Sequence, residues 1–183
     1  DRLEAFMGVV GSASGGPAIL PDADLVILAG VEFDYRIGQL DPPTVSADAD
    51  IIRIHADASR LRQGSEAGLS IQASPSIALD QLARACLELP CPPCVEWLAE
   101  AKKRRGDFRE RCRVSADTLP PGISGLDVVN VLGEVLEDDT VVLVDGGNIG
   151  QWFHQLLLDR YPGHWVSCGA SGVIGWGLPG AMA

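Results

Sequence analysis

The sequence predicts an α/β fold built as a doubly wound parallel sheet, and three observations carry this prediction. Several short runs are nearly continuous in apolar content, which is typical of parallel strands covered on both faces. Segments with apolar residues at three- and four-residue spacings lie between and after these runs. Strands that alternate with amphipathic helices indicate a layered fold with a parallel sheet.

The predicted strands cover residues 24–29, 50–57, 140–144 and 165–168. The predicted helices cover residues 76–89, 124–136 and 149–161, and residues 178–183 are typical of the first turns of a further helix. Ser74 and Pro75 supply the cap and first position of the helix over 76–89. Because both ends of the sequence look cut, we expect a fragment of a longer protein.

Residues 90–119 differ in composition from both flanks. The stretch begins with the proline-rich segment 90–94, and it carries seven of the 14 basic residues between positions 102 and 113, against two acidic ones. We predict a basic linker here, between an N-terminally incomplete domain over 1–89 and a C-terminally incomplete domain over 120–183. The linker is either a solvated helix held against an acidic neighbour or a docking site for an anionic substrate such as an acyl-CoA phosphate.

The overall composition excludes several classes of protein. The chain is 46% hydrophobic and 21% charged, which excludes intrinsic disorder. Its net charge of -11 repels phosphate backbones, so we expect no nucleic-acid partner. The longest apolar runs fall short of the roughly 18 residues that a membrane span requires, and we expect no membrane partner.

Five cysteines and no secretion signal predict reduced thiols and a cytoplasmic protein. Cys91 and Cys94 have the spacing of a redox pair, but they lie in a proline-rich hinge rather than at the start of a helix, so we expect neither redox chemistry nor zinc there. The three histidines are isolated from other ligand types and are predicted to be structural: His55, His154 and His164.

Two glycine-rich segments are the candidate sites. Residues 144–152 run from a strand end through Gly146 and Gly147 into a helix, where backbone amides can approach an anion. Residues 169–179 hold four glycines within nine positions. Each segment alone could be a tight turn or a packed loop, but one helix and one strand separate them, a spacing that brings both to the carboxyl edge of one sheet.

The two segments together resemble the thiamine-diphosphate-dependent superfamily of acetolactate synthases, benzoylformate decarboxylases and 2-hydroxyacyl-CoA lyases. Its pyrophosphate-binding domain carries an Asp-x-Gly turn, matched here by 145–147, and a Gly-x-Met/Ile/Leu-Gly-Phe/Trp-Gly-Leu-Pro-Ala-Ala segment, matched by 172–181 except at Gly180. Residues 23–38 and 50–57 resemble its Rossmann-like central domain. The resemblance implies a partial central domain followed by a truncated pyrophosphate-binding domain.

The resemblance also implies the roles of five residues. The backbone around Gly147, Asn148 and Ile149 would meet the diphosphate. The Gly172 carbonyl and the Ile174 amide would hold the aminopyrimidine edge, and the Ile174 side chain would be the apolar wedge that keeps the cofactor bent. The family's activating glutamate and its magnesium ligands match no residues here, so the fragment alone is expected to hold no metal, to contain no catalytic residue and to be inactive.

For the parent protein, the resemblance implies thiamine diphosphate, magnesium and a homodimer or homotetramer. Its reaction would make or break a C–C bond next to the carbonyl of a 2-oxo acid or a 2-hydroxyacyl-CoA. Members that bind FAD or ADP carry acidic residues where His55 and Ala73–Ser74 stand here, so we expect neither nucleotide. The alternative is a non-catalytic nucleotide-binding or assembly module of the same fold.

Overall fold

The computed structural model describes residues 4–10, 16–31, 33–64, 68–90, 92, 94–118, 121–157, 163–169 and 172–183. The chain forms two compact units. The N-terminal unit contains Val10–Ala13 and Ala18–Ala101, and the C-terminal unit contains Asp1–Val9, Ser14–Pro17 and Lys102–Ala183. The domain limits expected from composition stay a prediction.

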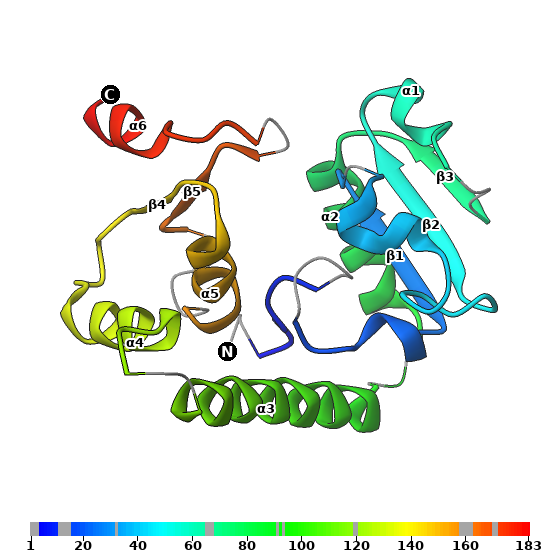
Figure 1. The fold of residues 1–183 in the computed structure, drawn as a ribbon. Helices are drawn as coiled ribbons and strands as arrows, with labels where there is room; N and C mark the ends of the chain where they lie inside the picture. Colours follow the sequence, from blue (N-terminus) through cyan, green and yellow to red (C-terminus); the bar gives the residue numbers. More distant parts are fainter. Residues whose placement is uncertain are drawn as a thin grey trace. The chain divides into compact units, whose positions relative to one another are not determined.

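The N-terminal unit is built on a three-stranded parallel sheet in the order β1-β2-β3 (Figure 1). Its strands are β1 (Leu25–Ala29), β2 (Asp50–His55) and β3 (Leu69–Gln72). Ile27 is in register with Ile52, and Ile54 with Ile71. The remaining elements of this unit are the 3-10 helices η1 (Leu20–Asp22) and η2 (Tyr35–Leu40) and the helices α1 (Ala58–Leu61) and α2 (Pro75–Glu88).

The core cluster of this sheet lies on the face that carries Val26, while the opposite face is buried at Ile54, which is 2% exposed. Val26 is 7% exposed and packs with Leu40 and Val45, whereas its neighbours on the opposite face, Leu25 and Ile27, are 47% and 37% exposed. β1 is therefore only partly covered on the face that carries Leu25 and Ile27. Helix α2 likewise has the predicted amphipathic pattern but no buried residue.

Helix α3 (Val95–Asp117) carries the basic residues, and the boundary between the two units falls within it. The elements that follow are α4 (Gly125–Val135), β4 (Val142–Val144), α5 (Asn148–Leu156), β5 (Trp165–Ser167) and α6 (Gly177–Met182). Strands β4 and β5 pair in parallel, with Leu143 opposite Val166. The predicted α/β fold with parallel strands is confirmed in both units.

The ends of the elements in the C-terminal unit follow from local chemistry. Ser124 and Asp127 form a reciprocal capping box that starts α4. Helix α5 starts and ends earlier than the predicted 149–161, and residues 158–161 lie outside the described part.

Within the described residues, no helix is both long and apolar enough to cross a membrane.

Candidate functional site

The first glycine-rich segment turns directly from β4 into α5. Gly147 has φ 92° and ψ 179°, a backbone conformation that is essentially restricted to glycine. Gly150 is buried, and a Cβ there would stand 3.1 Å from Val144 Cγ1. The missing side chain therefore lets α5 begin close against the end of its strand.

The start of α5 has the properties of an anion site. Its N-cap, Gly147, contributes no side-chain cap, and among the described residues other than its chain neighbours, no atom lies within 4 Å of where a Cβ on Gly147 would be. The first residues of the helix are Asn148 and Ile149, whose backbone amides lie at its positive end. A negatively charged group is the ligand that such a turn favours.

The second glycine-rich segment follows β5 and returns to this turn. Gly172 and Gly175 have positive φ values of 60° and 88°. Between them, Ile174 is 84% exposed, and its Cγ1 lies 3.3 Å from where a Cβ on Gly146 would be. The structure thus places an exposed apolar side chain next to the first turn. Residues 170 and 171 lie outside the described part.

Asp145 joins the two segments, and the sequence analysis did not select it as a site residue. Its Oδ1 accepts the backbone N–H groups of Gly146 (2.7 Å) and Gly175 (2.9 Å), and its Oδ2 accepts that of Gly177 (3.0 Å). The Gly177 N–H, with smaller contributions from the other two, lowers the pKa of Asp145. The sequence feature that could have pointed to Asp145 is its position, an acidic residue at the end of a strand and directly before two glycines.

The described residues fit part of a thiamine-diphosphate site. The open turn at Gly147, with room where a Cβ would stand, suits a diphosphate, and Ile174 beside it suits an apolar ring. Within the described ranges, no group of three or more His, Cys, Asp or Glu side chains could hold a metal ion. The roles expected for the five predicted site residues stay a prediction.

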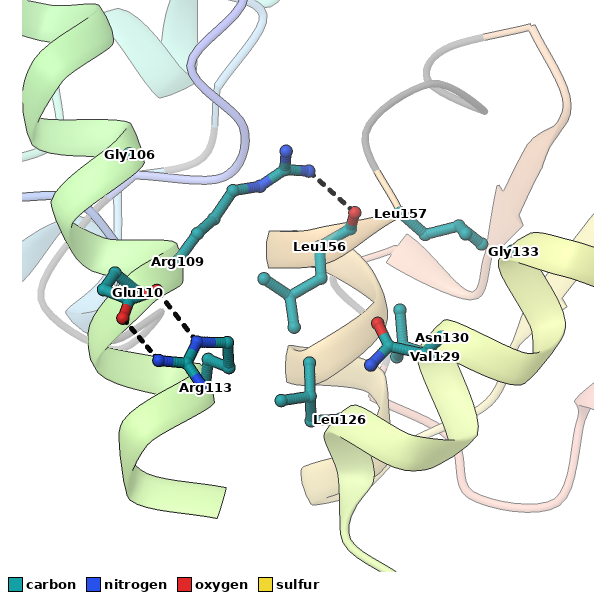
Figure 2. A pocket seen from close by; sticks show the side chains of 10 residues that line it. All are labelled: Gly106, Arg109, Glu110, Arg113, Leu126, Val129, Asn130, Gly133, Leu156 and Leu157. Atoms are coloured by element: carbon teal, nitrogen blue, oxygen red, sulfur yellow. Dashed lines mark hydrogen bonds and ion pairs between the residues drawn. The ribbon is translucent and has the colours of Figure 1, made fainter. Parts of the chain in front are cut away.

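A cavity lies at the C-terminal end of α5 (Figure 2). It has a volume of about 570 Å³, apolar walls from α4 and from Leu156 and Leu157, and charged groups from α3. Arg109 of α3 donates to the Leu156 carbonyl (2.8 Å), and Arg113 forms an ion pair with Glu110 (2.7 Å). Because its walls include the C-terminal end of α5, this cavity is separate from the glycine turn at the N-terminal end.

The basic residues of α3 make bonds inside the C-terminal unit. Lys102 forms an ion pair with Glu4, and Arg105 donates to the Phe6 carbonyl. Together with the bond from Arg109 to Leu156, these contacts support the first of the two alternatives for the basic segment, in which it is held against its neighbours. The alternative of an anionic docking site stays a hypothesis.

In the N-terminal unit, the carboxyl ends of β1 and β2 enclose a cavity of about 10 Å³, the size of one water molecule. Arg53 is 5% exposed, and its guanidinium lies 4.7 Å from the centre of the Phe33 ring. Burial lowers the pKa of Arg53. His55 Nδ1 accepts the Asp57 N–H at 2.9 Å, which gives this histidine a structural contact.

The fold and the paired glycine segments define the class: an α/β protein with a glycine-rich turn at the carboxyl end of a parallel strand. No protein-family model matches the chain. A solved structure described as that of a candidate thiamin diphosphate-dependent enzyme from Mycobacterium smegmatis has the same fold, with a TM-score of 0.56 and 23% identity over 86% of this chain and 28% of that chain.

Relatives in sequence agree with this fold. The chain is 27% identical to the probable acetolactate synthase 2, chloroplastic, of Oryza sativa subsp. japonica, over 96% of this chain and 26% of that protein. It is 27% identical to the acetolactate synthase isozyme 1 large subunit of Escherichia coli (strain K12), over 90% of this chain and 28% of that protein. It is 28% identical to 2-hydroxyacyl-CoA lyase 2 of Caenorhabditis elegans, over 86% of this chain and 25% of that protein.

These relatives confirm the predicted resemblance to the thiamine-diphosphate-dependent superfamily. They carry the names of enzymes from two branches of it, the acetolactate synthases and the 2-hydroxyacyl-CoA lyases. The chain spans about a quarter of the length of these relatives.

Proposed function

We propose that the C-terminal unit carries the diphosphate-binding turn and the apolar wedge of a thiamine-diphosphate site. The observation that supports this most directly is the position of Ile174, an exposed apolar residue, beside the open turn that starts α5. In this proposal, the backbone around Gly147, Asn148 and Ile149 binds the diphosphate. The Gly172 carbonyl and the Ile174 amide bind the aminopyrimidine edge.

The chain's own residues would bind and orient the cofactor. The glycine turn would hold the diphosphate end of the molecule, and the Ile174 side chain would be the apolar wedge that supports its bent form. When bound, thiamine diphosphate supplies a nucleophilic carbon for attack on a carbonyl. Magnesium is part of the proposal for the whole protein.

We further propose that the whole protein makes or breaks a C–C bond next to the carbonyl of a 2-oxo acid or a 2-hydroxyacyl-CoA. The names of the relatives, acetolactate synthases and 2-hydroxyacyl-CoA lyases, support both substrate classes equally. A homodimer or homotetramer remains part of this proposal. Reading the coding frame on both sides of this segment tests it: a Gly-Asp-Gly motif with a later Asn downstream and a glutamate-bearing domain upstream are expected.

Isothermal titration with thiamine diphosphate, thiamine and ADP, in magnesium-containing buffer and on a chain that includes the whole pyrophosphate-binding domain, tests the binding proposal. We expect heat of binding with thiamine diphosphate and weaker binding of thiamine, because thiamine lacks the anion that the α5 turn recognises. Binding of ADP without binding of thiamine diphosphate would contradict the proposal. It would favour the alternative, a non-catalytic nucleotide-binding module.

A further inference from the structure

Asp145 forms hydrogen bonds to both glycine-rich segments. One of its partners, Gly146, is its neighbour, while Gly175 and Gly177 lie 30 and 32 positions further along the chain. Both carboxylate oxygens take part: Oδ1 faces Gly146 and Gly175, and Oδ2 faces Gly177. The carboxylate thus bridges the end of β4 and the segment that leads into α6.

The packing around the bridge leaves little room for another arrangement. A Cβ on Gly177 would stand 3.1 Å from Asp145 Oδ2 and 3.2 Å from Asp145 Cβ, so a side chain there would push the segment away. A Cβ on Gly180, one turn later in α6, would meet the Trp176 ring at 2.7 Å and Leu143 Cδ2 at 3.3 Å. The start of α6 is therefore packed directly on β4.

The bridge also determines where Ile174 lies. Ile174 directly precedes Gly175, whose N–H is bound by Asp145 at 2.9 Å. On the other side, Ile174 Cγ1 approaches Gly146, whose N–H is bound by the same carboxylate oxygen. The backbone next to Ile174 and the glycine turn thus bind one common atom, Asp145 Oδ1.

We propose that Asp145 is the positioning residue that sets the separation between the diphosphate-binding turn and the aminopyrimidine-binding loop, acting through the amides of Gly175 and Gly177. This inference rests on the proposed function. Asp145 itself contacts neither part of the cofactor in this account. Its loss should weaken recognition of a ligand that spans both segments and spare a ligand that occupies the turn alone.

Asp145→Asn is the appropriate variant because an amide keeps the size of the side chain and has one acceptor oxygen instead of two. The Asn oxygen can accept from Gly175 or from Gly177. The NH₂ group then faces the N–H of the other glycine, and because both groups are donors, that hydrogen bond is lost. Asp127→Asn is the matched control. It makes the same change of charge at another carboxylate of the C-terminal unit, one that accepts the Ser124 N–H at 2.7 Å in the capping box of α4.

The two probes are thiamine diphosphate and inorganic pyrophosphate, titrated into each variant and followed by ¹H–¹⁵N chemical shifts. We expect Asp145→Asn to weaken thiamine diphosphate binding about tenfold, the scale of one lost charge-assisted hydrogen bond, and to leave pyrophosphate binding unchanged. Asp127→Asn should change neither affinity. Equal weakening of both probes by Asp145→Asn, or no weakening, would overturn the positioning role while leaving the proposed function intact.

A wild-type protein that binds pyrophosphate and thiamine diphosphate equally, or binds neither, would instead overturn the proposed function and the positioning role together. A second measurement needs no variant. In the wild type, the amide protons of Gly175 and Gly177 should titrate with one common midpoint, below the usual aspartate value of about 3.9, because both bind the same carboxylate. Separate midpoints for the two amides would contradict the bridge.

Discussion

At the scale of the residue, the candidate site depends on backbone conformations more than on side chains. Gly147, Gly172 and Gly175 all have positive φ values, and within the described part of the chain, their sequence neighbours apart, no atom lies within 4 Å of where a Cβ on any of them would be. These positions therefore need glycine for its backbone freedom and not because space is short. Gly150 is the opposite case, since it is buried and lies close to Val144.

Gly147→Ala should destabilise the C-terminal unit by about 1–3 kcal/mol, because alanine opposes the conformation at φ 92° and ψ 179°. Gly106→Ala is the control: this glycine lies inside α3 with no atom within 4 Å of its Cβ position, so alanine should stabilise the helix by about 1 kcal/mol. Urea unfolding of both variants measures the two effects. Equal stabilities would show that the turn is not restrained as described.

Sequence reasoning could find part of the site at this scale. Gly147 and Ile174 were identifiable because glycine-rich turns and the pattern around Ile174 are local features. The bridging role of Asp145 could not be predicted from the sequence, because two of its three hydrogen-bond partners lie 30 and 32 positions away and donate through their backbones. Backbone donors leave no side-chain signature in a sequence.

At the scale of the element, the strongly apolar strands and the periodic helices were predictable. The predicted runs over 24–29, 50–57, 140–144 and 165–168 contain β1, β2, β4 and β5. Strand β3, Leu-Ser-Ile-Gln, was missed because it is short and half polar, and its pairing with β2 makes it a strand. Helix α1 was missed because it has four residues and depends on its cap, Asp57.

The contact between α5 and β5 predicts a pH dependence. The His154 ring lies 4.9 Å from the Trp165 ring, and burial lowers the pKa of His154 below 6.5. The folded state disfavours the charged imidazole of His154. The stability that the neutral His154 contributes is therefore complete above pH 6.5, and it is lost as the pH falls through the lowered pKa of the folded state.

Thermal unfolding of the wild type between pH 8 and pH 5 should therefore show a falling midpoint below about pH 6.5. His154→Phe keeps an aromatic ring against Trp165 without an ionisable group, and it should reduce this fall. His55→Phe, in the N-terminal unit, is the matched control and should leave the fall in place. An unchanged pH profile in His154→Phe would contradict the role of this contact.

At the scale of the whole molecule, both units present unpaired strand edges and apolar side chains. In the part of the chain that the structure describes, the sheets have three and two strands, fewer than the four to six that are common, so each exposes hydrogen-bonding groups. Several apolar residues are more than 70% exposed: Leu87, Ile123, Ile174, Leu178 and Met182. Such surface favours association with other protein surfaces.

We therefore expect the isolated chain to pair or aggregate. Light scattering coupled to size-exclusion chromatography should give a mass above the 19.3 kDa of one chain, and the mass should rise with protein concentration. A monodisperse monomer with one cooperative thermal transition would contradict this expectation. Isolated strand edges and exposed apolar residues would then be stable without a partner.

The central claim is that the two glycine-rich segments form one site for thiamine diphosphate. The most direct test is a ¹H–¹⁵N chemical-shift titration of the chain with thiamine diphosphate. We predict shifts at the amides of Gly147 to Ile149 and of Gly172 to Gly175 together, with one binding constant. Shifts confined to the N-terminal unit, or at one glycine-rich segment without the other, would contradict it.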